Sequence, residues 1–181
     1  DYIEQTFGVD NTNLKKGMGG YMLISAVKKE DSFVDKEVSK SNSRIEFDIF
    51  GKTLIAETPG SLFSKEGLND GTRLLLESTE KKIAGANKIL DLGCGWGAIS
   101  ISVLSKRPDV YLAATDVLPK AVQTTKKNLK SLNVDTRNFK VLCSFNPRSI
   151  SNKDFDLVLS NPPYHERTDV LKELFRNTMS V

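Results

Sequence analysis

The sequence is poor in the residues that build metal sites, disulfide frameworks and membrane spans. It has two cysteines and one histidine among 181 residues. A single histidine excludes histidine-rich zinc sites, and Cys94 and Cys143 both lie in predicted core segments, where free buried thiols are expected. No apolar run approaches the ~20 residues that a membrane-spanning helix needs. We therefore expect no metal and no membrane contact and, with no signal peptide visible, a cytoplasmic location.

Neither sign of charge dominates the chain. It has 26 Lys and Arg against 23 Asp and Glu, a net charge of +3, and 39% of its residues are hydrophobic. This composition and length predict a globular protein with one full core. The mild positive charge permits an RNA partner but does not require one, because nucleic-acid binding usually involves clustered basic residues. The oligomeric state is left open.

The first half of the chain predicts two short β-structures and a helix. Residues 21–27 form a predicted strand after Gly19 and Gly20, within a segment (1–43) that otherwise has no clear pattern. Residues 44–50 alternate charged and apolar side chains, the period of a half-buried strand, and Gly51-Lys52 leads to a second strand at 53–56. An amphipathic helix is expected over residues 71–83.

From residue 87 onward strands and helices alternate, which predicts a doubly wound, mostly parallel sheet of the Rossmann-like α/β class. The expected strands cover residues 88–92, 110–115, 139–143 and 155–159, and the expected helices 98–105, 119–132 and 168–179, with an irregular piece near 148–152.

A glycine-rich turn follows the first of these strands, in the motif Asp91-Leu-Gly-Cys-Gly-Trp-Gly97. Glycine permits a positive φ and a close approach of a ligand to the backbone, and the following helix offers free N–H groups. Asp116 ends the next strand, where a carboxylate can reach the ribose of a nucleoside; a helix cap or a solvated loop residue is the alternative. The Gly-x-Gly-x-Gly spacing departs from the Gly-x-Gly-x-x-Gly of dinucleotide oxidoreductases. Trp96 could pack beside a cofactor or on the first helix.

A second motif, Asn161-Pro-Pro-Tyr164, follows the strand at 155–159. Ligands bind beyond the carboxyl ends of parallel strands, so both motifs should share one edge of the sheet. Pro162 and Pro163 stiffen the backbone and lack N–H donors, so carbonyl acceptors remain. The Asn161 side-chain oxygen and the Pro162 carbonyl could accept hydrogen bonds from one –NH₂ group and aim its lone pair, while Tyr164 could stack on a planar base. An ordinary strand-ending turn is the alternative.

Together these motifs resemble class I S-adenosylmethionine-dependent methyltransferases, and more closely the "methyltransferase small" group, which includes rRNA guanine-N2 methyltransferases. The stretch from Pro59 to Leu76 resembles the segment that leads into the domain of that group. The resemblance implies S-adenosylmethionine as cofactor and Asn161, Pro162, Pro163 and Tyr164 as the catalytic residues. The residues that it implies for cofactor binding are Phe63, Ser64, Asp91, Gly93, Cys94, Gly95, Gly97, Asp116, Val117 and Asn161.

The chain departs from the family pattern at two places. Phe145 stands where the family usually has an acidic residue that contacts the adenine amino group. In the family sheet, three strands follow the Asn-Pro-Pro-Tyr strand, but in this sequence only one predicted helix follows it before Val181. Residues 7–29, near the start of the sequence, resemble such closing strands instead. A circular permutation, a piece of a tandem protein and a missing C-terminal part remain alternatives. We accordingly expect a segment 1–43 that resembles closing strands and a catalytic domain over 44–181.

The resemblance implies methylation of an exocyclic amino group, with guanine N2 in ribosomal RNA as the first expectation and ribosomal RNA or a ribosomal subunit as partner. A release-factor glutamine amide is the runner-up substrate, because it is also planar and carries –NH₂. Enzymes of that kind would be expected to have a helical N-terminal recognition domain, which residues 1–43 do not resemble. A degenerate, non-catalytic RNA-binding module is the third possibility.

Overall fold

The computed structural model describes residues 12–16, 22–26, 43–58, 67–144, 154–162 and 172. The chain divides into two compact units, Asp1–Ser39 and Lys40–Val181. In the first unit, β1 (Thr12–Lys16) and β2 (Met22–Ala26) form an antiparallel pair with Thr12 opposite Ala26. The predicted strand at 21–27 is confirmed as β2. That this segment supplies closing strands, and that the domain boundary lies between residues 43 and 44, stay predictions.

The second unit begins with the predicted hairpin, made of β3 (Ser43–Ile49) and β4 (Lys52–Thr58). The side chains of Ile45, Phe47 and Ile49 are buried and their neighbours along β3 are not, as the alternating pattern predicts. Between the strands, Phe50 and Gly51 both have positive φ (53° and 71°). Two such residues in a two-residue loop match the right-handed twist of a hairpin, and one of them is a glycine.

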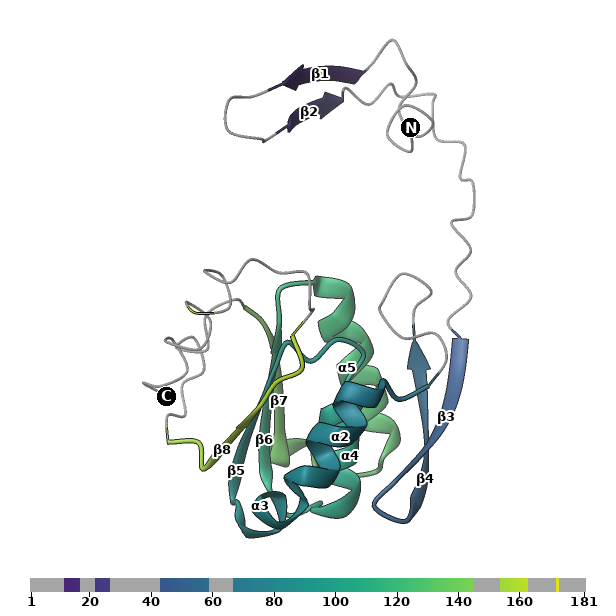
Figure 1. Ribbon diagram of the computed structural model, residues 1–181, viewed down its shortest axis with the longest axis vertical. Coiled ribbons are helices and arrows are strands. Elements are labelled where there is room, and N and C mark those ends of the chain that lie inside the picture. Colours follow the sequence, from purple (N-terminus) through teal and green to yellow (C-terminus); the bar gives the residue numbers. More distant parts are fainter. Residues whose placement is uncertain are drawn as a thin grey trace. The chain divides into compact units, whose positions relative to one another are not determined.

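A four-stranded parallel sheet forms the centre of this unit, in the order β7-β6-β5-β8 (Figure 1). The strands are β5 (Lys88–Leu92), β6 (Tyr111–Asp116), β7 (Phe139–Cys143) and β8 (Leu157–Leu159). The chain runs outward from β5 to β6 and β7 and then returns to the other side of β5. The order therefore reverses between β5 and β8, the place where ligands bind in open α/β sheets.

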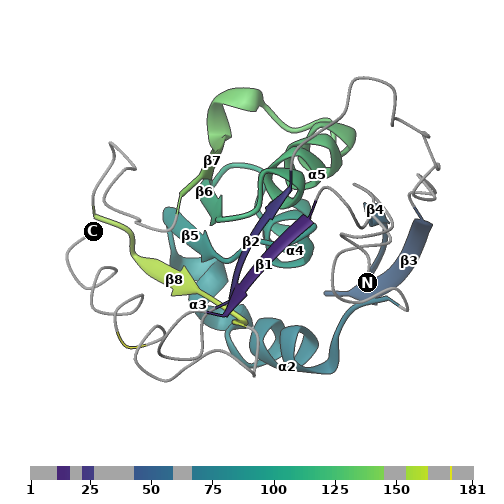
Figure 2. The same ribbon diagram turned by 90° about the horizontal axis from the view of Figure 1, so that it is seen from above.

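Helices cover one face of this sheet and separate it from the β3–β4 hairpin (Figures 1 and 2). They are α2 (Asp70–Ser78), α4 (Ala98–Lys106) and α5 (Pro119–Ser131), while the short α3 (Glu80–Gly85) precedes β5 and the 3₁₀ turn η2 (Thr136–Asn138) precedes β7. Pro119 stands at the first turn of α5, where its missing N–H costs nothing. The predicted α/β class is confirmed.

The helix predicted over residues 71–83 is wrong in its extent, because the structure divides it into α2 and α3 at Thr79. The Thr79 hydroxyl donates to the Leu75 carbonyl (2.6 Å), and the neighbouring Ser78 hydroxyl donates to the same oxygen (3.1 Å). Serine and threonine side chains that compete for backbone carbonyls favour helix ends over helix interiors. The helical segment expected at 168–179 and the piece near 148–152 lie outside the described residues, except that residue 172 is helical.

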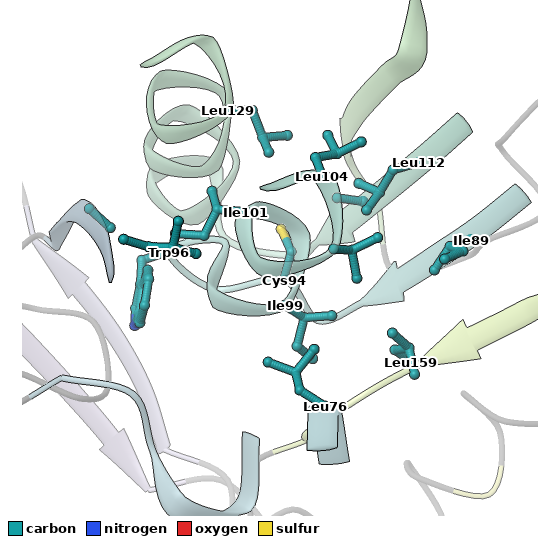
Figure 3. Close-up of a cluster of buried hydrophobic side chains, with 14 of the residues drawn as sticks. Leu76, Ile89, Cys94, Trp96, Ile99, Ile101, Leu104, Leu112, Leu129 and Leu159 are labelled. Carbon is teal, nitrogen blue, oxygen red and sulfur yellow. The ribbon is translucent and has the colours of Figure 1, made fainter. Parts of the chain in front are cut away.

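The main core lies between the sheet and the helices, and it extends to the hairpin (Figure 3). Ile89 of β5, Leu112 of β6 and Leu159 of β8 point into it from the sheet, and all three are at most 1% exposed. Trp96 packs edge-on against Phe47 of the hairpin, with ring centroids 5.6 Å apart. Trp96 is thus buried in the core at the hairpin, a location that neither sequence-based alternative named. A smaller cluster around Leu90 and Ala113 forms a second core.

Asn128 on α5 joins three parts of this core although its side chain is polar and only 3% exposed. Its Nδ2 donates to the carbonyls of Glu57 (2.9 Å) and Trp96 (2.8 Å), and its Oδ1 accepts from the Glu57 N–H (2.9 Å). One amide therefore satisfies three backbone groups of β4 and of the glycine-rich turn. Buried polar groups are tolerated when they are paired in this way.

Replacing Asn128 by alanine is expected to destabilise the protein by about 2 kcal/mol, because the paired backbone groups remain buried without partners. Chemical denaturation measures the change in the free energy of unfolding. Asn138→Ala is the matched control, since the Asn138 side chain makes one hydrogen bond within the described residues, an exposed one to the Pro108 carbonyl (2.9 Å). Equal, small losses in both variants would contradict a structural role for Asn128.

The structure tests the expectation that both cysteines are free and buried. Both thiols are free, but Cys143 is exposed, so the prediction that both cysteines are buried is wrong for it. Cys143 is the last residue of β7, which is an edge strand of the described sheet, and this explains its exposure. None of the described helices has the length and apolarity to cross a membrane. The described residues also contain no cluster of three or more potential metal ligands.

Candidate active site

The two sequence motifs come together at the carboxyl ends of β5 and β8. The strands are adjacent and parallel, with Asp91 of β5 opposite Leu159 of β8. The Ser160 hydroxyl then donates to the Leu92 carbonyl (2.8 Å), which fastens the two strand ends to each other. Asn161 follows immediately. The prediction that both motifs share one edge of the sheet is therefore confirmed for the described residues.

The glycine-rich turn is held by backbone hydrogen bonds to the end of β6. The N–H groups of Gly93 and Cys94 both donate to the Thr115 carbonyl, at 2.8 and 2.9 Å. The three glycines of the motif all have positive φ, 77° at Gly93, 56° at Gly95 and 94° at Gly97. This conformation is rarely adopted by other residues, so the motif spacing follows from the backbone that the turn requires.

Gly97 is the position where a side chain would fit least well. It immediately precedes α4, and a Cβ atom there would lie 3.1 Å from the Cγ2 and Oγ1 atoms of Thr125 and 3.3 Å from its Cα. Thr125 on α5 in turn donates its hydroxyl to the Gly95 carbonyl (2.9 Å). The glycine-rich turn therefore packs closely on the Thr125 side chain of α5, and a larger residue at position 97 would require one of them to shift.

Asp116 at the end of β6 faces the turn. Its Oδ2 accepts from the Gly95 N–H (2.8 Å), and its Oδ1 accepts from the Leu118 N–H (2.9 Å). These bonds fix the plane of the carboxylate and use about half of its capacity to accept hydrogen bonds, because each oxygen has two lone pairs. The next residue, Val117, is 55% exposed. A fixed carboxylate beside an exposed apolar side chain suits a ligand with adjacent hydroxyl groups and an aromatic part.

Asp91 is fully buried below the turn, and its contacts are to α4. Its Oδ2 accepts from the Ser100 hydroxyl (2.5 Å) and from the Ser100 N–H (3.1 Å). Its Oδ1 has no hydrogen-bond partner in the described part of the chain. Burial raises the pKa of the Asp91 carboxyl to about 7, an effect that the Ser100 hydrogen bonds partly oppose. Asp91 thus binds the first turn of α4, and its predicted role toward a cofactor stays a prediction.

The raised pKa of Asp91 predicts a specific pH dependence of stability. Between about pH 4 and about pH 7 the unfolded state loses this proton while the folded state keeps it, so stability falls as the pH rises through this window. Relative to Asp91→Asn, the wild-type free energy of unfolding should fall by up to about 1.4 kcal/mol per pH unit there. Denaturant titrations at several pH values measure this difference.

Asp156 is a control for this pH dependence, because the pKa of its carboxyl is shifted in the opposite direction. Its Oδ2 accepts from the N–H groups of Asn87 (2.7 Å) and Lys88 (2.9 Å), and these bonds lower the pKa of its carboxyl. Its contribution to stability is therefore present above the ordinary pKa and is lost as the pH falls. A constant difference between wild type and Asp91→Asn across the window would contradict the assignment for Asp91.

The Cys94 thiol lies under the turn and is only 6% exposed. Its Sγ is 3.4 Å from the Thr125 hydroxyl, and burial raises its pKa far above the usual range. Such a thiol is not a nucleophile near neutral pH. If Cys94 contributes to a ligand site, it does so through its backbone.

Asn161 is linked to the first turn of α2. Its Nδ2 donates to the Thr72 hydroxyl oxygen (2.8 Å) and lies 3.3 Å from Asn69 Oδ1. Asn69 is the N-cap residue of α2. The Oδ1 atom of Asn161 accepts no hydrogen bond from the described residues. Within the described residues, both lone pairs of the Asn161 amide oxygen are therefore available to a ligand.

Several predicted site residues lie outside the described residues. They are Phe63, Ser64, Pro163 and Tyr164, whereas Pro162 is described and half-buried. Phe145, the predicted departure from the family pattern, also lies outside the described residues. The described site therefore consists of the glycine-rich turn, Asp116, Val117, Asn161 and Pro162, with Asp91 below it.

Sequence reasoning missed five residues that support this site, namely Asn69, Thr72, Ser100, Thr125 and Asn128. Of these, only Asn69 had a recognisable signal. Asparagine followed by Asp-Gly-Thr before an apolar run is typical of a helix N-cap. The others act through contacts between distant segments, and no local pattern reveals such contacts.

The comparison with protein families decides where this chain belongs. The family model described as "Methyltransferase small domain" matches residues 53–181. The chain belongs to this family. The resemblance predicted from the glycine-rich and Asn-Pro-Pro-Tyr motifs is thereby confirmed.

Relatives of this methyltransferase small domain are named "Ribosomal RNA small subunit methyltransferase C". The one from Erwinia tasmaniensis is 33% identical over 134 residues, which are 72% of this chain and 37% of that protein. The one from Haemophilus influenzae is 37% identical over 115 residues, 64% of this chain and 33% of that protein. The chain thus spans about a third of the length of these relatives.

A solved structure supports the fold. The Thermus thermophilus 16S rRNA N2 G1207 methyltransferase, solved in complex with AdoMet and guanosine, superposes with a TM-score of 0.69 at 20% sequence identity. The match covers 96% of this chain and 46% of that one. At this level of identity the similarity establishes the Rossmann-like methyltransferase fold of the chain.

Proposed function

We propose that this chain is an S-adenosylmethionine-dependent N-methyltransferase domain that modifies the exocyclic N2 amino group of a guanine in ribosomal RNA. The observation that carries the proposal is the geometry at the carboxyl ends of the adjacent strands β6, β5 and β8. These ends hold the Asp116 carboxylate, the glycine-rich turn and Asn161, whose amide oxygen accepts no hydrogen bond from the described residues. The family membership and the names of the relatives support the same activity. A cytoplasmic location and a ribosomal partner are part of the proposal.

The described residues fit S-adenosylmethionine. Each oxygen of Asp116 accepts one hydrogen bond from the described residues and can accept another from a ribose hydroxyl, and the exposed Val117 side chain offers an apolar surface for the adenine. In the turn from Gly93 to Gly97, the glycines have no side chains, so the methionine part of the cofactor can approach the backbone closely. We also assign Asp91, Cys94, Phe63 and Ser64 to this pocket from the family resemblance. When bound, the cofactor supplies a methyl group that is already activated by a sulfonium.

The protein's own contribution to the reaction is mainly the orientation of the target nitrogen. Asn161 Oδ1 and the Pro162 carbonyl accept the two hydrogens of the amino group, which directs its lone pair away from the ring plane and toward the methyl group. Tyr164 stacks on the base and Pro163 stiffens the segment. The amino nitrogen would gain the methyl group as the methyl–sulfur bond breaks, and would then be cationic and acidic enough to release one proton to water, so a strong general base is not needed. The target guanine is expected to be flipped out of a helix or single-stranded.

The proposal is tested by a calorimetric titration with S-adenosylmethionine, followed by a transfer assay on under-methylated small ribosomal subunits. We expect saturable one-to-one binding and one methyl group on a guanine N2, located by mass spectrometry of the rRNA. Transfer to a release-factor glutamine instead would favour the protein substrate. A folded chain that does not bind the cofactor would contradict catalysis and favour a degenerate binding module.

A further inference from the structure

We propose that Asn69 and Thr72, at the first turn of α2, are positioning residues that fix which end of the Asn161 amide faces the substrate. The inference rests on the proposed function for its catalytic consequence. Its structural part depends only on three side chains that the fold brings together from two distant segments.

The orientation of the Asn69 amide follows from its role as N-cap. Its Oδ1 accepts from the N–H of Gly71 (2.9 Å) and of Thr72 (3.3 Å), two of the free donors at the start of α2. A backbone N–H can only donate, so the atom of Asn69 at this position must be the oxygen. The helix terminus therefore determines the polarity of the Asn69 side chain.

The orientation of the Asn69 amide in turn determines the orientation of the Asn161 amide. An amide oxygen placed 3.3 Å from Asn69 Oδ1 would face another acceptor, so the nitrogen of Asn161 is the atom that lies there. The same nitrogen donates to Thr72 Oγ1 at 2.8 Å. Because a hydroxyl can donate as well as accept, the Thr72 contact holds the amide in place, while the Asn69 oxygen selects its nitrogen. The carbonyl end of the amide must then point away from the helix.

The orientation matters because the substrate also presents an NH₂ group. With the carbonyl outward, Asn161 accepts one of its hydrogens and leaves the lone pair free for the methyl group. With the amide rotated by 180°, two donors would face each other, and the alignment of the nitrogen would be lost. Thr72 is only 6% exposed and Asn161 is half-buried, so their hydrogen bond is partly shielded from water.

The test compares Thr72→Val with the matched control Thr124→Val. Both residues are buried helical threonines, at 6% and 7% exposure, but the Thr124 hydroxyl donates only to the Lys120 carbonyl of its own helix. For Thr72→Val we expect kcat to fall about tenfold, as for one hydrogen bond, with little change in the affinity for S-adenosylmethionine. Thr72→Ser keeps the hydroxyl and should restore kcat, while Thr124→Val should behave as wild type.

A second measurement does not depend on activity. The side-chain NH₂ resonances of Asn161, recorded by ¹⁵N NMR on the full chain, should shift in Thr72→Val and remain unchanged in Thr72→Ser and Thr124→Val. If Thr72→Val does not fold, Asn69→Gly serves in its place, because glycine is an acceptable N-cap but provides no side-chain oxygen. Should the wild type transfer no methyl group, the proposed function fails and the NMR comparison alone decides the positioning role.

The proposal is overturned if the Asn161 resonances are the same in wild type and Thr72→Val. It is also overturned if Thr72→Val and Thr124→Val reduce kcat equally, since a general loss of packing would then explain both. A tenfold loss in Thr72→Val alone, with the shifted resonances and the serine rescue, supports it.

Discussion

Replacing Asn161 by alanine is expected to lower the rate of methyl transfer by about 100-fold or more, since one preorganised polar contact to the reacting group contributes this much in other enzymes. The amide oxygen of Asn161 is an acceptor that receives no hydrogen bond from the described residues. Cofactor affinity should be largely retained, because the glycine-rich turn and Asp116 keep their mutual hydrogen bonds. A single-turnover assay and a calorimetric titration measure the two quantities separately.

Asn138→Ala is a suitable control for this variant. Asn138 lies in the 3₁₀ turn η2 ahead of β7, and its side chain contacts only the exposed Pro108 carbonyl in the described structure. Its transfer rate should equal that of wild type. Equal losses of rate and cofactor affinity in Asn161→Ala would show that Asn161 supports the cofactor pocket and would refute its assigned role toward the substrate nitrogen.

Replacing Gly97 by alanine is expected to destabilise the protein by about 3 kcal/mol and to abolish cofactor binding. The φ of 94° costs an alanine about 1–2 kcal/mol. The new Cβ would also lie 3.1 Å from the Thr125 side chain and 3.3 Å from its Cα, and overpacking of this kind costs about 1–3 kcal/mol. Relief of the contact would move the turn away from α5.

Gly85→Ala is the matched control for Gly97. Gly85 ends α3, its φ is not positive, and a Cβ atom there would have no neighbour within 4 Å. Its effect on unfolding should be small. Thermal or chemical denaturation, together with calorimetry on the folded fraction, distinguishes the two variants. A Gly97→Ala variant as stable as Gly85→Ala would mean that the turn adapts and that the glycine is not required there.

Much of the fold can be predicted from local sequence patterns. The alternation along β3 and the turn at Gly51 predict the hairpin, because burial on one face imposes a period of two. The strands β5 and β7 begin and end at the predicted residues. Positive φ values at all three glycines of the turn follow from the motif itself. These features depend on neighbours in sequence, so a single chain reveals them.

Other features depend on side-chain hydrogen bonds or on strand order, which local sequence patterns do not reveal. The division between α2 and α3 results from two hydroxyl groups that compete for the Leu75 carbonyl, while the apolar periodicity continues across the break. Cys143 looks like a core residue within an apolar strand, yet the strand order places it at an exposed edge. The hydrogen bonds from Ser100 to the buried Asp91 carboxylate join β5 to α4 and have no local sequence signal, while the expected role of Asp91 toward a cofactor stays a prediction.

The sequence by itself determined the α/β class, the family and the identity of the two motifs, because these follow from short-range patterns of glycine, proline and apolar residues. The tertiary structure alone decided how the motifs act together. Strand order placed β8 beside β5, and so brought Asn161 next to the glycine-rich turn. Packing of the domain also places the start of α2 beside Asn161. There the Asn161 amide nitrogen contacts Asn69 and Thr72, so its amide oxygen points away from the helix. Such contacts join residues far apart in the chain, and only packing of the whole domain creates them.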